Sequence, residues 1–108
     1  MSQSYTNIPD ILDQLPDIPA DSIISHTLFS DDSVKTILFG FAPGQELSEH
    51  TASHPAILHF LQGEARLTLG DDVMEAAPGT WVHMPAHLPH SVYAKTEVAM
   101  ILLLLLSD

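Results

Sequence analysis

The sequence predicts an all-β sandwich or barrel. Three observations support this class: short apolar segments recur at regular spacing, turn residues separate them, and prolines interrupt the one stretch that could otherwise become helical. The length of 108 residues is typical of one domain with one core, and a hydrophobic content of 45% is ample for packing its interior.

An irregular arm is expected over residues 1–21. Pro9, Pro16 and Pro19 exclude a long helix there. A single helical turn is predicted over residues 10–15, because proline suits the position at which a helix starts. The apolar side of this turn is expected to lie on the barrel or on a neighbouring subunit.

Nine strands are expected within the β domain, residues 22–108. Ser30-Asp31-Asp32, Pro43-Gly44, Gly63, Gly70-Asp71-Asp72 and Pro78-Gly79 supply turn and hairpin signals between them. The expected strands are 22–29, 33–42, 46–51, 56–62, 64–69, 73–76, 80–84, 90–95 and 97–106. In the last strand the side chains that point to either face are apolar, which indicates burial on both faces. Its outer face would be covered by the arm or by a second subunit.

Composition excludes several classes of protein. A net charge of −11 disfavours binding to nucleic acid or to anionic membranes. The absence of cysteine rules out disulfides and thiolate metal sites. The N-terminus lacks the pattern of a signal peptide, and the apolar run near the C-terminus is about half of what a bilayer span needs, so a cytoplasmic protein is expected. Charged residues are only 16%, which suggests a surface partly covered in a homodimer.

Two histidines, His50 and His90, each lie beside turn residues and a predicted strand, about forty residues apart. Neutral imidazole is the commonest protein ligand of divalent metals. If the intervening strands fold back, the two rings can share one pocket.

The residues around them resemble the two sequence motifs of a small single-domain cupin. Gly44, His50 and Gly63 match the frame of the first motif, and Gly79, Pro85 and His90 that of the second. The resemblance covers residues 34–106 and implies a jelly-roll barrel, also called a double-stranded β-helix. It implies little about activity, because this fold carries many unrelated functions.

The chain departs from the motifs at the other metal-ligand positions. The second histidine and the glutamate of the first motif are replaced by Ala52 and Ala56, so that only His50 and His90 match the usual ligand set. Two side chains hold a divalent ion poorly. His54 shares strand parity with Ala56 and is the best candidate for a third ligand of Zn, Fe, Mn, Ni or Cu. The alternative is a hydrogen-bonded polar patch without metal.

An apolar cup with histidines at one end is expected. By strand parity its wall would include Leu58 and Phe60 on one strand and Val82 and Met84 on another. His87 would stand at its rim, and Glu46 shares parity with His50 and could be a pocket acid. Alanines at positions 52 and 56 leave volume for an organic ligand, unless core side chains fill it.

No catalytic residue is identified, since the chain has no serine–histidine–aspartate arrangement, phosphate loop or cysteine nucleophile. The favoured interpretation is a cupin that binds a small, partly apolar molecule. The alternatives are a metal-dependent enzyme, such as a dioxygenase or an isomerase, and a non-catalytic homodimeric domain.

Overall fold

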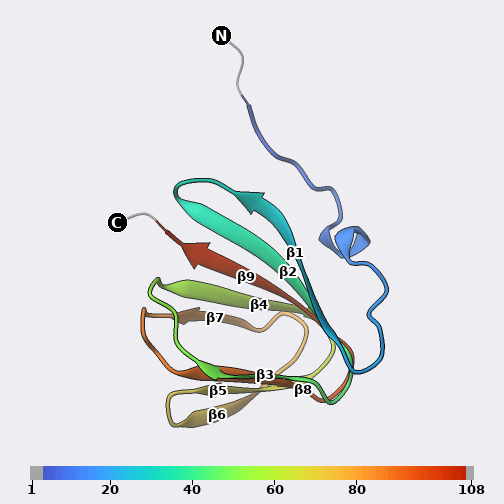
Figure 1. Cartoon of the computed structure of the whole chain (residues 1–108), viewed down its shortest axis with the longest axis vertical. Coiled ribbons are helices and arrows are strands. Elements are labelled where there is room, and N and C mark those ends of the chain that lie inside the picture. Colours follow the sequence, from blue (N-terminus) through green and yellow to red (C-terminus); the bar gives the residue numbers. More distant parts are fainter. Residues whose placement is uncertain (1–3, 107–108) are drawn as a thin grey trace.

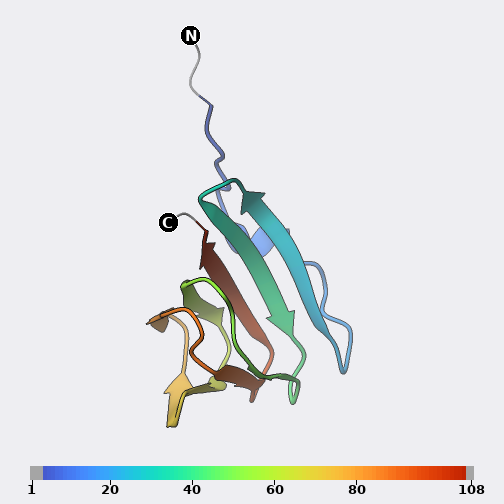
Figure 2. The same ribbon diagram turned by 60° about the vertical axis from the view of Figure 1, so that its left-hand side comes forward.

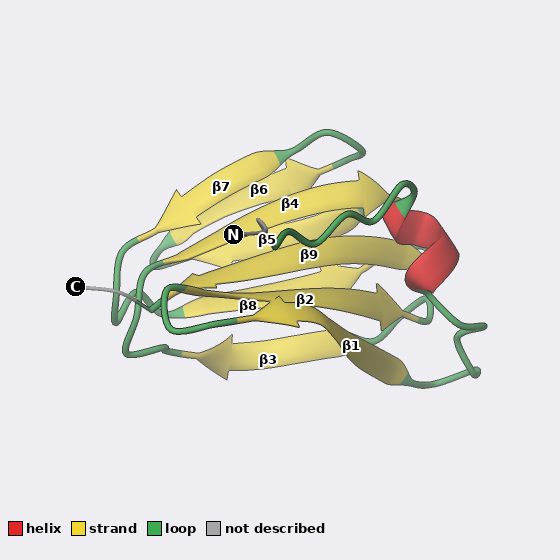
Figure 3. Cartoon of the chain, turned by 90° about the horizontal axis from the view of Figure 1, so that it is seen from above, coloured by secondary structure: helices red, strands yellow, loops and turns green. Residues whose placement is uncertain are grey.

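The computed structural model describes residues 4–106, which form two antiparallel sheets packed face to face (Figure 1). One sheet has the strand order β1-β2-β9-β4-β7 and the other the order β3-β8-β5-β6 (Figure 3). The strands are β1 (Ile23–Ser30), β2 (Val34–Phe41), β3 (Glu46–His50), β4 (Ala56–Gln62), β5 (Ala65–Leu69), β6 (Asp72–Ala76), β7 (Trp81–Met84), β8 (His90–Ala94) and β9 (Val98–Leu105). The prediction of an all-β fold with nine strands is confirmed, and the architecture is a jelly roll.

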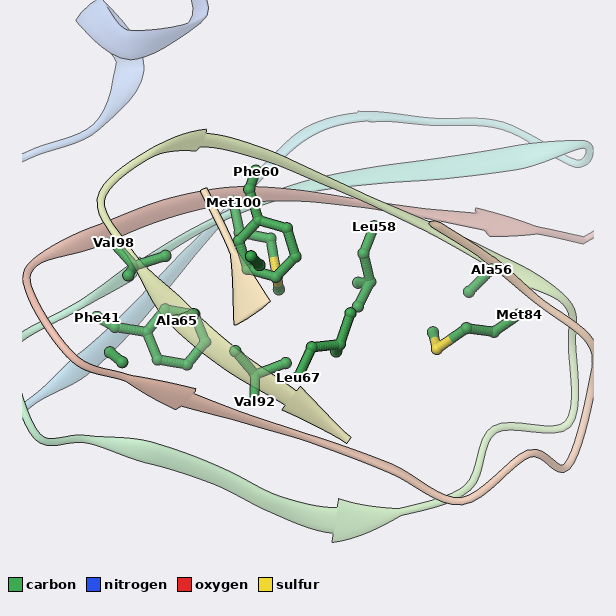
Figure 4. Close-up of a cluster of buried hydrophobic side chains, with 12 residues drawn as sticks. Phe41, Ala56, Leu58, Phe60, Ala65, Leu67, Met84, Val92, Val98 and Met100 are labelled. Carbon is green, nitrogen blue, oxygen red and sulfur yellow. The ribbon is translucent and has the colours of Figure 1, made fainter. Parts of the chain in front are cut away.

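The hydrophobic core lies between the sheets and is built by alternation. Along β4, Ala56, Leu58 and Phe60 are buried while the residues between them are partly exposed. Phe60 packs in the same cluster as Phe41 (Figure 4), and each fully buried side chain of this size contributes about 1.5–3 kcal/mol. Ala56 and Met84 stand at one end of the cluster, where small and flexible side chains replace the aromatic rings.

The N-terminal arm covers part of the outer face of the five-stranded sheet. It contains one turn of 3₁₀ helix, η1 (Ile11–Gln14). A Cβ atom added to Gly40 on β2 would lie 2.8 Å from Ile18 Cδ1 and 2.9 Å from Leu15 Cδ1, so glycine permits the arm to approach the sheet closely. Ala99, the cross-strand partner of Gly40, is fully buried.

The last strand is buried on both faces only in its first half. Val98, Ala99, Met100 and Ile101 are all buried, whereas residues 102–105 are partly exposed. Figure 2 shows this strand (dark red) beside the first two strands of the same sheet. Within residues 4–106, no helix is both long and apolar enough to cross a membrane. The cytoplasmic location stays a prediction.

Candidate functional site

His50 and His90 lie side by side at the same end of the four-stranded sheet. His50 ends β3, His90 begins β8, and the two residues are cross-strand partners in an antiparallel ladder. Their ring centroids are 4.2 Å apart, with an interplanar angle of 58°. The two imidazoles, which are distant along the chain, therefore meet as the sequence suggested.

A β-bulge decides which way His50 points. The β3–β8 register shifts between Leu47 and His50, and Leu47 packs against the core. Without a bulge, strict alternation would place Glu46 and His50 together on the opposite face from Leu47. The extra residue reverses the parity and turns His50 toward the inside.

Both imidazoles are held in the same tautomer by backbone carbonyls. His50 Nδ1 lies 2.7 Å from the carbonyl oxygen of Ser48, and His90 Nδ1 lies 3.0 Å from that of Leu88. A carbonyl oxygen can only accept, so each Nδ1 carries the proton and donates. In the neutral rings, each Nε2 therefore keeps a free lone pair.

Burial favours the neutral form of His90, which is only 6% exposed. Desolvation is the largest influence and lowers the pKa of its imidazole below 6.5. The hydrogen bond to the Leu88 carbonyl opposes this shift, and the neighbouring His50 ring adds to it. At the His90 ring, the site therefore presents a hydrogen-bond acceptor rather than a positive charge.

A cavity of about 200 Å³ adjoins the two rings. Its residues come from β4, β7, β9 and the loops beside the histidines, and His54 lines it as well. The apolar wall includes Ala52, Ala56, Met84, Leu88, Leu102 and Leu104. The two alanines that depart from the cupin motifs thus border open space, as their small size suggested.

Of the side chains that the sequence placed in the pocket wall, only Met84 lines the cavity. Leu58 and Phe60 face inward but are buried deeper in the core, and Val82 packs against that core. Parity predicted the face of each residue correctly, but it carries no information about depth along the strand. Leu102 and Leu104 were missed as wall residues, although the alternation of the last strand could have identified them.

Glu46 and His87 were also expected at the pocket and do not line the cavity. Glu46 is exposed and pairs with Tyr93 in the β3–β8 ladder. It does not line the cavity, because the bulge separates its face from that of His50. His87 is exposed in a turn with φ 69°, and its backbone N–H donates to the carbonyl oxygen of Ala52 at 2.8 Å. This hydrogen bond joins the two loops beside the histidines.

The metal set His50, His54 and His90 stays a prediction. His54 lines the cavity but is exposed, and within residues 4–106 no three or more histidine, aspartate or glutamate side chains are grouped closely enough to hold a metal ion. As arranged, the chain brings two imidazoles together where a stable site needs three or four ligands, so a resident divalent ion would need His54 or another ligand to join them.

Residues 37–106 match the sequence model of the family described as "Cupin domain". The chain belongs to the cupin family. This match spans more than half of the chain and includes both histidines and the cavity. No curated protein sequence matches this cupin.

Solved structures agree with this assignment. A cupin superfamily protein from Desulfitobacterium hafniense is 28% identical, with 95% of this chain and 94% of that chain covered and a TM-score of 0.84. A Streptococcus pyogenes protein of unknown function is 25% identical, with coverages of 98% and 92% and the same TM-score. An RmlC-like cupin from Shewanella frigidimarina, 14% identical with coverages of 98% and 94% and a TM-score of 0.79, supports the fold alone.

Proposed function

We propose that this cupin binds a small, partly apolar molecule in the cavity beside His50 and His90. The observation that carries the proposal is the combination of an apolar wall with two fixed imidazoles at one end. Ligand-binding sites commonly combine apolar walls with a few convergent polar groups. Both rings are oriented before any ligand arrives, which lowers the entropic cost of binding.

Thermal unfolding in the presence of small neutral ring compounds, alcohols, sugars and acids tests this proposal. A ligand at a hundred times its Kd stabilises the folded state by about 2.7 kcal/mol. For a domain of this size, that is on the order of 10 °C in Tm. If no compound raises the Tm of the wild type at such concentrations, the proposal is wrong.

The Ala52→Leu variant places extra volume in the cavity and should abolish the shift. Ala52 is half-buried in a loop, so the longer side chain can enter the cavity without displacing a strand. Ala20→Leu is the matched control, since Ala20 is exposed in a turn before β1. Equal ligand-induced shifts in the two variants would place binding outside this cavity.

A metal-dependent enzyme is the second candidate function. The observation that favours it is the free Nε2 atom on each ring, because hydrogen-bonded Nδ1 atoms orient metal-binding histidines in general. His54 would have to turn inward as the third ligand. Elemental analysis of protein purified without an affinity tag tests this candidate. Metal well below one equivalent per chain, with no uptake of added Fe, Mn, Ni or Zn, would contradict a metal-dependent enzyme.

We also propose that this cupin forms a homodimer through the outer face of its five-stranded sheet. None of the 14 acidic residues lies in the five strands of that sheet, although the whole chain carries a net charge of −11. Trp81 on this face is 59% exposed, and Ile57 and Leu103 are only half-buried. The arm, which carries Asp10, Asp13 and Asp17, covers only part of this face. Over the strands themselves, where carboxylates are absent, two acidic copies meet with the least repulsion.

The opposite sheet has a different surface. Glu75 on β6 pairs with Lys95 and, at 3.8 Å, with Arg66, so charged groups occupy the outward face of the smaller sheet. Light scattering at micromolar concentration should give a dimer for the wild type and a monomer for Trp81→Glu. Val73→Glu, at an apolar residue that is 63% exposed on β6, is the matched control and should stay dimeric. A monomeric wild type, or an equal response of both variants, contradicts the proposal.

A further inference from the structure

The chemistry of the cavity narrows its ligand to one class. Resting on the proposed function, we infer that the ligand is a neutral molecule of one ring that carries a hydroxyl donor, as phenol does, and that carboxylates are excluded. The argument uses the tautomers of the two histidines, the charge of the surroundings and the cavity volume.

The polar atoms left for a ligand are acceptors. Each Nδ1 is already committed to a backbone carbonyl, that of Ser48 for His50 and that of Leu88 for His90. Neither Nε2 has a hydrogen-bond partner among the described residues, and both rings line the cavity. A ligand therefore satisfies this site by donating a hydrogen bond, which a hydroxyl group does and an ether does not.

Anions and cations are both disfavoured. A carboxylate offers acceptors only, and no lysine or arginine lines the cavity to neutralise it. The net charge of −11 repels it further. An ammonium group could donate, but it would lose its hydration against a wall of alanine, methionine and leucine side chains, where an unpaired charge is costly.

The volume sets the size of the ligand. A dry apolar cavity of roughly 150 Å³ in another protein binds benzene. The cavity of about 200 Å³ in this cupin therefore accommodates one six-membered ring with a small substituent. Leu102 and Leu104 of β9 and Met84 of β7 would contact the ring, and the hydroxyl would lie at the histidine end.

Calorimetric titration with phenol, toluene, anisole and benzoate tests the inference. Toluene matches the size of phenol without its donor, anisole keeps the oxygen but replaces its hydrogen with methyl, and benzoate carries charge. Phenol should bind more tightly than toluene or anisole by about 2–13-fold, the worth of one net hydrogen bond, because its hydroxyl has a single proton to donate. Benzoate should bind most weakly.

The His50→Ala variant should reduce the preference for phenol over anisole by about twofold, because the single hydroxyl proton then has one Nε2 acceptor in place of two. His50 is exposed, so the variant is expected to fold. His59→Ala is the control, because His59 pairs with Ile101 and Trp81 on the outer face of β4 and should leave the preference unchanged.

The outcomes separate this inference from the proposed function. Equal binding of phenol, toluene and anisole, or tightest binding of benzoate, overturns the assignment of a donor while leaving a ligand-binding cavity. If none of the four binds but another compound raises the Tm and Ala52→Leu abolishes that effect, the ligand class is wrong and the proposed function stands. If no compound at all binds, both are wrong.

Discussion

Replacing Gly63 with alanine should destabilise the fold far more than the same change at Gly44. Both glycines belong to the first cupin motif, and their backbones are nearly alike, with φ of +85° and +83°. Their surroundings differ. A Cβ atom added to Gly63 would overlap the carbonyl oxygen of Glu97 and lie 2.9 Å from its carbonyl carbon, whereas nothing lies within 4 Å of one added to Gly44.

The expected cost follows from these two environments. A left-handed backbone costs a non-glycine residue about 1–2 kcal/mol, and this term applies at both positions. At Gly63 the backbone must also move away from Glu97. That motion opens the adjoining hydrogen bonds from Glu64 N to Thr96 Oγ1 and from Lys95 N to the Glu64 carbonyl, both 2.9 Å long. At about 1 kcal/mol each, the loss at Gly63 totals roughly 3–4 kcal/mol.

Urea titration of the two variants, analysed by linear extrapolation, measures the difference. We expect Gly63→Ala to lose about 2 kcal/mol more than Gly44→Ala, a large part of the total stability of a small domain. Losses that agree within about 0.5 kcal/mol, below the worth of one hydrogen bond, would refute the role assigned to the Glu97 carbonyl.

Three further predictions concern pH, the core and a turn. Because burial lowers the pKa of His90 below 6.5, the unfolded ring binds a proton between this pH and the lower folded pKa that the native ring does not bind. The contribution of His90 to the free energy of unfolding should therefore be constant above pH 6.5 and fall as the pH drops toward the folded pKa, by at most about 1.4 kcal/mol per pH unit. The fall should shrink in a His90→Gln variant titrated with urea at each pH, and an equal fall in both proteins would contradict this role. Leu58→Ala should lower the free energy of unfolding by about 2–5 kcal/mol in the same assay, because Leu58 is 2% exposed. Leu12, which is 38% exposed, is the control, and Leu12→Ala should lose well under half as much. Similar losses in the two variants would contradict the assigned core. Asp31→Ala should lower the free energy of unfolding by about 1–2 kcal/mol, because the Asp31 carboxylate accepts backbone hydrogen bonds of 2.8 and 2.9 Å from Ser33 and Val34. Asp32→Ala is the control, and equal losses in the two variants would contradict this role for Asp31.

Turn residues and alternation predicted the strands because both act locally on the backbone. Asp31 and Asp32 fill the connection between β1 and β2, and the glycine-led hairpin at Gly70 joins β5 to β6. The inward face of β4 also followed from parity, since Leu58 and Phe60 are buried. Parity failed for Glu46, because the bulge before His50 depends on how β3 pairs with β8.

The amino-acid order alone determined the class of fold, the number of strands and the two imidazoles that share one site, since hydrophobic periodicity, turn chemistry and motif spacing are written into neighbouring residues. Tertiary structure decided the rest: the tautomer of each ring, the size of the cavity and the part of the outer face covered by the arm. These depend on distances between segments such as β4, β8 and β9, which come together only when cross-strand register and side-chain packing are in place.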